Sequence, residues 1–110
     1  MNLIDIESTV KINGYVTIPL TISELNSEKT DEIINNYVSN LDFKELEYID
    51  WTIQEYDETA IVNVSGYVTT TVKVDMDNYK NPKNNINKNI ENMDFGPLSD
   101  ITWIIQTCDI

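Results

Sequence analysis

A repeat with a period of 52 residues constrains this chain more than any other feature of its sequence. Residues 10–58 align with residues 62–110 without a gap, and 17 of the 49 aligned positions are identical. Self-similarity at a fixed period is the signature of an internal repeat, and the length fits one domain. We therefore interpret residues 1–110 as a single domain built by tandem duplication. Twelve of the 17 identities fall in three separated blocks: Val10–Thr17 with Val62–Thr69, Asn40–Phe43 with Asn92–Phe95, and Ile49–Gln54 with Ile101–Gln106.

Each unit of the repeat has the pattern of a strand, a helix and a second strand. In the first unit, apolar and polar residues alternate over residues 10–22, which is the period of a half-buried strand. Apolar residues then recur at helical spacing over residues 33–41, and alternation returns over residues 49–54. The second unit repeats these segments with an asparagine-rich, weaker helix. Gly14 and Gly66 stand at the same place in the two long strands and predict a bulge or bend there.

The element order βαββαβ predicts an α+β, ferredoxin-like fold. Right-handed crossovers then place two helices on one face of a four-stranded antiparallel sheet with the strand order 4-1-3-2. We expect Trp51 and Trp103 to be buried between this sheet and the helices. Asp42 and Asp94 follow the two helical segments, each before a phenylalanine, and we expect their carboxylates to bind turn amides.

The inventory of titratable residues excludes most enzyme chemistries. The chain has no histidine, no arginine and a single cysteine, Cys108. It therefore has no imidazole base, no Cys-His or Ser-His pair, no bidentate arginine clamp, no internal disulfide and no cysteine zinc cluster. Paired carboxylates alone could perform acid-base chemistry or bind calcium, but no Asp-x-Asp-x-Asp-Gly loop is present. We predict no enzymatic activity, no catalytic residue, no cofactor and no metal site.

Negative charge is concentrated in the first repeat. The net charge is −12, and residues 1–58 hold thirteen acidic residues and three lysines, against six acidic residues and four lysines in residues 59–110. Such charge repels nucleic acids and anionic lipids but favours a basic groove on another protein, where carboxylates imitate phosphates. The alternative is that the acidity only keeps the protein soluble. The candidate partner-binding residues are Glu28, Asp31, Glu32, Glu45, Glu47, Asp50, Asp57 and Glu58.

The helix-free face of the predicted sheet offers an alternative interface. Tyr15, Thr17, Tyr67 and Thr69 have the parity opposite to the apolar positions of their strands. Tyrosine is enriched at protein interfaces, so this face would bind a second copy or a different protein. RNA-recognition domains stack bases on such aromatics, but the charge of this chain opposes that function. Tyrosine and threonine are also simply good strand formers.

The N-terminus has no signal-peptide pattern, and no segment approaches the roughly 18 apolar residues of a membrane span. We therefore expect a cytoplasmic protein. In size, charge, lack of a signal peptide and compact α/β pattern, the chain resembles the small acidic anti-defence proteins of bacteriophages and mobile elements, including anti-CRISPR and anti-restriction proteins. Its arginine-free, asparagine- and isoleucine-rich composition looks like that of proteins encoded by AT-rich genomes, as in many Firmicutes and their phages. The resemblance covers the whole chain but no motif, so no functional residue carries over.

The resemblance implies an inhibitor that occupies the nucleic-acid groove of a nuclease, with a CRISPR effector in the host bacterial cytoplasm as the leading hypothesis. Two alternatives stay open. One is a duplicated structural or assembly module that interacts through its tyrosine- and threonine-bearing face, with a homodimer as one form of that interaction. The other is a small-molecule-binding domain or cofactorless enzyme with a ferredoxin-like cleft.

Overall fold

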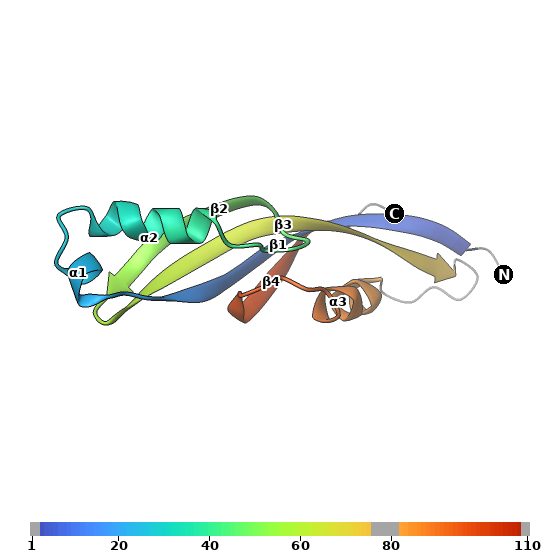
Figure 1. Cartoon of the computed structure of the whole chain (residues 1–110). Coiled ribbons are helices and arrows are strands. Elements are labelled where there is room, and N and C mark those ends of the chain that lie inside the picture. Colours follow the sequence, from blue (N-terminus) through green and yellow to red (C-terminus); the bar gives the residue numbers. More distant parts are fainter. Residues whose placement is uncertain (1–2, 76–81, 109–110) are drawn as a thin grey trace.

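The computed structural model describes residues 3–75 and 82–108, which form a mixed α+β fold with one antiparallel sheet of four strands and three helices (Figure 1). The strand order is β2-β3-β1-β4, which is the predicted order 4-1-3-2 read from the opposite edge. The predicted order of the sheet is therefore confirmed. In chain order the elements are β1 Leu3–Pro19, α1 Ile22–Leu25, α2 Thr30–Ser39, β2 Glu47–Tyr56, β3 Thr59–Asp75, α3 Lys83–Glu91 and β4 Ser99–Cys108.

The centre of the sheet is a long antiparallel pair formed by β1 and β3. Each strand has 17 residues, and the register runs unbroken from Leu3 opposite Asp75 to Pro19 opposite Thr59. The edge strands cover overlapping stretches of this pair that are offset by three positions: β2 pairs with residues 60–67 of β3, and β4 pairs with residues 8–15 of β1, which lie opposite residues 63–70 of β3.

The result is a rod rather than the compact domain expected from the sequence. Its principal extents are 63 × 19 × 17 Å, and its radius of gyration is 18.1 Å. A compact chain of this length would have a radius of gyration of about 13 Å. The elongation arises because β1 and β3 continue past the ends of the two shorter edge strands.

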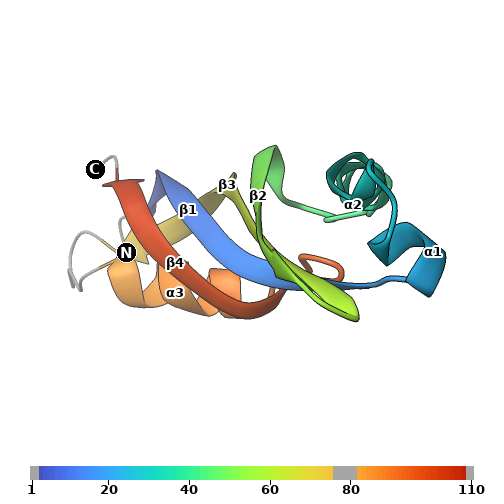
Figure 2. The same ribbon diagram turned by 90° about the vertical axis from the view of Figure 1, so that its left-hand side faces the viewer.

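One face of the central pair is buried along most of its length. The even-numbered residues of β1 and β3 are buried, except Ile4 near the start of β1, which is half-buried, whereas the odd-numbered ones are exposed or half-buried. Helix α2 contacts β1 and helix α3 contacts β3, and each helix buries an apolar pair, Ile34 with Val38 and Ile86 with Ile90. Because long strands twist, the covered face turns along the rod, so that α2 and α3 lie on different sides in the end view (Figure 2).

The prediction of two helices is wrong, because a third, α1, follows β1. It is a single turn with a capping box: Thr21 Oγ1 accepts a hydrogen bond from the Glu24 amide, and the Glu24 carboxylate accepts one from the Thr21 amide. The Thr-x-x-Glu spacing is the sequence signal for this motif. Strand β1 also begins earlier than predicted, at Leu3, since Ile4 and Ile6 continue its alternation.

The two tryptophans lie on the predicted side of the sheet but are only half-buried. Both pack against the core from the edge strands β2 and β4. The indole N–H of Trp51 donates to Asn35 Oδ1 at 3.0 Å, and that of Trp103 donates to Asn87 Oδ1 at 2.9 Å. The expectation of full burial is corrected because an edge strand leaves one flank of each ring in solvent.

The loops that follow α2 and α3 meet at the middle of the rod. Asp42 Oδ1 accepts a hydrogen bond from the Lys44 amide, and Asp94 Oδ1 accepts one from the Gly96 amide, both at 2.9 Å. The predicted binding of turn amides by these aspartates is therefore confirmed. The loops contact each other where the amide of Glu45 donates to the carbonyl of Asp94 at 3.4 Å.

Candidate acidic docking surface

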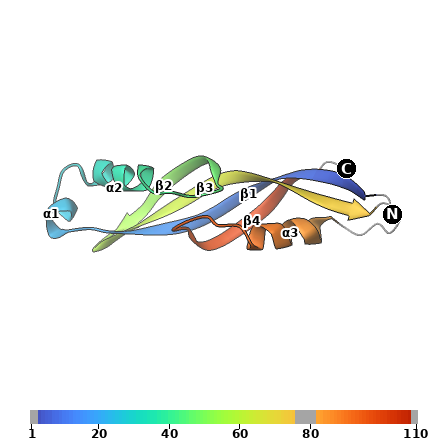
Figure 3. The same ribbon diagram turned by 45° about the vertical axis from the view of Figure 1, so that its right-hand side comes forward.

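The candidate partner-binding carboxylates fall into two groups along the rod. The first, which we call the end group, lies at the end of the rod where α2 begins and β2 turns into β3 (Figure 3). It consists of Glu28, Asp31, Glu32, Asp57 and Glu58. The second, the middle group, consists of Glu45, Glu47 and Asp50 at the start of β2. Along the chain, six residues of β2 lie between Asp50 and Asp57, which places these two residues about 23 Å apart in an extended strand.

The end group is built by the start of α2 and the β2–β3 turn. Asp31 and Glu32 occupy the first turn of α2, where the helix dipole favours negative charge. Residues 27–32 line one hollow together with Tyr56, the last residue of β2, which places the helix start beside the strand end. Glu58 lines a neighbouring hollow with α1.

The side chain of Thr30 holds the loop before α2. Thr30 is buried. Its hydroxyl lies within hydrogen-bond distance of two carbonyl oxygens that can accept its proton, that of Ser27 at 2.7 Å and that of Glu24 at 2.8 Å. Glu28, between these anchors, remains exposed. The buried Thr30 hydroxyl thus holds the loop in place, while the Glu28 carboxylate faces solvent.

The middle group surrounds a tyrosine that the sequence analysis did not single out. Tyr48 is 83% exposed and has a φ of 53°, which is unusual for a bulky residue. Its position falls between Glu47 and Asp50 on the outer strand of the sheet. The equivalent residue of the second repeat, Asp100, has nearly the same φ of 51°.

The candidate carboxylates are exposed, and two of them accept a hydrogen bond from a backbone amide: Asp50 from Trp51 at 2.9 Å and Glu45 from Asp94 at 3.3 Å. All eight are exposed, and within residues 3–75 and 82–108 none has a lysine partner. The ion pair Lys44–Asp42 at 3.1 Å and the longer one between Lys73 and Asp5 at 4.0 Å involve other acids. The charge of both groups is therefore available to a partner.

Two acids outside the predicted set have altered pKa values. The Thr21 amide, followed by the Tyr37 phenol, donates to Glu24 and lowers the pKa of its carboxyl group. The backbone amide and the ammonium group of Lys44 lower the pKa of Asp42. Both shifts come from local hydrogen bonds that stabilise the carboxylate.

The alternative interface does not gather into one aromatic patch. Thr17 and Thr69 are exposed, but Tyr15 and Tyr67 are half-buried. Tyr15 lies opposite Asn63 and Tyr67 lies opposite Lys11, so the backbone positions of the two tyrosines are four ladder steps, or about 13 Å, apart along the strands.

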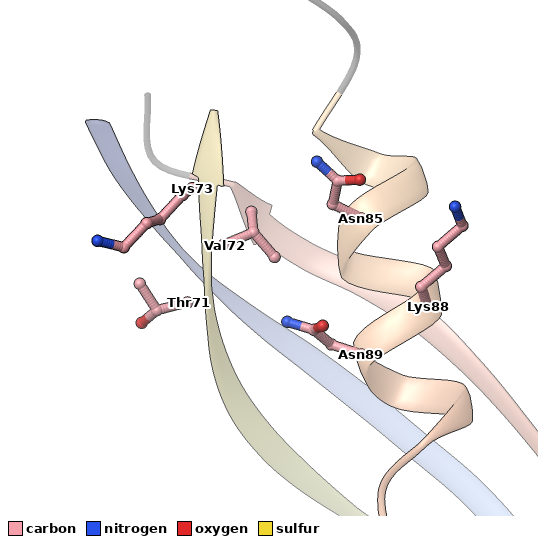
Figure 4. Close-up of a pocket in the computed structure, with 6 residues that line it drawn as sticks. All are labelled: Thr71, Val72, Lys73, Asn85, Lys88 and Asn89. Atoms are coloured by element: carbon pink, nitrogen blue, oxygen red, sulfur yellow. The ribbon is translucent and has the colours of Figure 1, made fainter. Parts of the chain in front are cut away.

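A hollow of about 280 Å³ between β3 and α3 has little capacity for chemistry (Figure 4). Lys73 and Lys88 line it, but Figure 4 shows their ammonium ends pointing away from one another. Asn89 Nδ2 is engaged with Thr70 Oγ1 at 3.0 Å. Across the described residues, no group of three or more acidic, histidine or cysteine side chains could hold a metal ion.

Comparisons with protein-family models, with curated proteins and with solved structures find no match to this chain. Among the described residues, no helix is long and apolar enough to cross a membrane.

Proposed function

We propose that this protein is a non-enzymatic inhibitor or binding protein that docks its acidic groups on a basic, nucleic-acid-binding surface of another protein. The observation that carries the proposal is the set of eight exposed carboxylates, distributed from the start of β2 to the end of the rod, that form no ion pair with any lysine in the described part of the chain. Complementary charge of this kind accelerates association and selects a basic partner.

The shape of the chain supports the same proposal. The acidic groups lie at the two ends of β2, which is an outer strand of a rod only 19 × 17 Å in cross-section. Negative charge spaced over about 30 Å of a narrow body resembles a short stretch of phosphate backbone. The most specific form of the proposal is an anti-CRISPR-type inhibitor that occupies the nucleic-acid groove of a CRISPR effector nuclease, encoded by a phage or mobile element.

We also infer that the fold is ferredoxin-like and arose by duplication of a βαβ unit. Matching interactions recur at the 52-residue spacing: indole to asparagine in Trp51–Asn35 and Trp103–Asn87, and aspartate to turn amide in both central loops. The helix α1 is specific to the first unit among the described residues. Shared ancestry does not require the difference in charge between the units, so that difference favours a later, functional origin.

A second candidate function is an assembly module that uses the helix-free face of the sheet. The observation in its favour is that the odd-numbered side chains of β1 and β3, including Thr17 and Thr69, are not covered by a helix in the described part of the chain. Such an interface would depend on packing rather than on charge.

The test is a pull-down with the full chain from a bacterial lysate, followed by mass spectrometry and by affinity measurement with the captured protein. A charge-led complex weakens steeply between low and physiological salt. Capture of a basic nucleic-acid-binding protein with this salt dependence is the expected result. Salt-independent binding to the captured protein would favour the assembly module instead.

A further inference from the structure

The two outer strands of the sheet differ in how their free edges are protected. In the described residues, the strand order leaves one edge of β2 and one edge of β4 without a neighbouring strand. Natural sheets commonly place charged side chains on such edges, which prevents pairing with another chain. Strand β2 carries Glu47, Asp50 and Glu55.

Strand β4 has less of this protection, because its one charged residue, the exposed Asp100, lies near its start. The positions equivalent to the three glutamate and aspartate residues of β2 are Ser99, Thr102 and Thr107. From Ile101 to Cys108 the strand has no charged residue at all. The edge of β4 is therefore open to pairing, in a protein whose other outer strand is acidic.

The side chains of β4 add apolar surface on both faces. Ile104 is 66% exposed and stands where β2 has Thr52. Trp103 and Ile105, on the core side, are only half-buried. A strand added beside β4 would cover all three of these side chains.

We propose that β4 pairs antiparallel with β4 of a second copy of this chain, so that two sheets join into one sheet of eight strands. Charge favours the β4 edge over the β2 edge for a contact between two copies. Two copies that each carry −12 repel one another over most of their surfaces, and the second repeat, with a net charge of −2, offers the least repulsion.

The strand is also compatible with itself across a two-fold axis. Directly opposed residues of an antiparallel pair lie on the same face of the sheet. With the axis at Ile104, that residue faces its own copy on the helix-free face, and Trp103 faces Ile105 of the second copy on the core side. Such an interface is isologous and closed, as in most homodimers.

The dimer leaves the acidic groups accessible. Strand β2 lies at the opposite edge of each sheet, so the joined sheet presents one β2 at each outer edge. The proposed dimer therefore does not depend on the proposed function, and an experiment that contradicts one of them does not contradict the other. A strand-edge contact buries less area than a standard protein interface, so we expect a dimer that forms in the micromolar range.

The test is sedimentation velocity of the full chain between about 1 μM and 1 mM, the range that separates weak from moderate affinity. The test variant is Thr102→Asp with Thr107→Glu, which places on β4 the charges that β2 carries at the equivalent positions, Asp50 and Glu55. The control is Thr52→Asp with Gln54→Glu, which adds the same charge to β2. Circular dichroism and thermal unfolding check that each variant is folded.

We expect the wild-type chain and the control to dimerise alike and the β4 variant to associate at least tenfold more weakly. A wild-type chain that stays monomeric throughout, or a control that weakens association as much as the β4 variant, would overturn the proposal. As a second measurement, Ile104→Cys in a Cys108→Ser background should form a disulfide-linked dimer on mild oxidation. Equal cross-linking by Thr52→Cys in that background would contradict pairing through β4.

Discussion

Leu98 packs directly over Gly14 at the middle of the rod. A Cβ atom added to Gly14 would lie 2.6 Å from Leu98 Cγ, and the same relationship joins Gly66 to Leu46. The pairing registers shift at both glycines, between Asn13 and Tyr15 in the β1–β4 pair and opposite Gly66 in the β2–β3 pair. The bulge or bend predicted at these glycines is therefore present, and each accommodates a leucine from the strand-entry loop of the other repeat.

Substituting either glycine should destabilise the fold. We expect Gly14→Ala and Gly66→Ala each to lower the free energy of unfolding by about 1–3 kcal/mol, the usual cost of overpacking a core. Chemical denaturation measures the change. Because the two sites have matching geometry, the two losses should be similar. Unchanged stability in either variant would show that the leucine moves aside and that the close contact does not constrain the sheet.

The hydrogen bonds from tryptophan to asparagine should contribute unequally. The bond from Trp103 to Asn87 is partly buried, whereas the one from Trp51 to Asn35 is exposed. We expect Asn87→Ala to cost about 0.5–1.5 kcal/mol of unfolding free energy, with a smaller loss for Asn35→Ala.

Half-burial should also limit the cost of removing the indoles. Truncating either tryptophan to alanine should cost less than the roughly 3–5 kcal/mol typical of a fully buried ring. Urea denaturation followed by circular dichroism measures both series, and a greater loss for Asn35→Ala than for Asn87→Ala would contradict the burial described here.

The capping box of α1 should respond to acid. The folded-state pKa of Glu24 is lowered, mainly by the Thr21 amide and next by the Tyr37 phenol. Its stabilisation is therefore fully present above the unfolded-state pKa and is lost as the pH falls through the lower folded-state value. Tyr37→Phe should raise the pKa of Glu24 towards its ordinary value without restoring it completely, because the Thr21 amide remains.

Titration of the Glu24 carboxyl carbon by NMR measures this shift. Tyr56→Phe is the control, because it removes a phenol from the same end of the rod without touching Glu24. A pKa that is the same in wild type and Tyr37→Phe would show that the phenol does not stabilise the carboxylate in solution.

The repeat and the alternation of apolar residues were sufficient to predict the strand order. These two signals failed where an element is short or where a polar residue interrupts the apolar alternation. Helix α1 has four residues, too few for a helical period, and was detectable only through Thr21 and Glu24. The early start of β1 was obscured by Ser8, a polar residue that is fully buried because its hydroxyl donates to the carbonyl of Thr107.

The site was predicted less completely than the fold. The eight carboxylates are exposed, as surface residues of their elements should be. Their distribution along β2, from Glu47 at its start to Asp57 after its end, follows from the bounds of the strand, which the alternation gave only as residues 49–54. The exposure of Tyr48 depends on its positive φ, for which a tyrosine in a strand pattern gives no signal.

Charge reversal in the two acidic groups should separate function from folding. Glu28→Lys with Glu32→Lys changes the end group, and Glu45→Lys with Glu47→Lys changes the middle group. Isolated surface substitutions usually alter stability by less than about 0.5 kcal/mol, so both variants should fold. Each should weaken partner binding mainly by slowing association.

The control is Glu7→Lys with Glu91→Lys, which changes the net charge equally. Both residues are exposed and lie outside the two acidic groups. A protein that binds only through its overall charge would be affected alike by all three double variants, whereas a defined docking surface would not.

The most direct test of the acidic docking surface is the association rate of the captured partner with these three double variants at two salt concentrations. We predict that the end-group and middle-group variants associate more slowly at low salt, that the control associates like the wild type, and that raising the salt narrows the difference. Unchanged association in both acidic-group variants, together with loss of binding in Tyr15→Ala or Tyr67→Ala, would contradict the proposal and place the interface on the helix-free face.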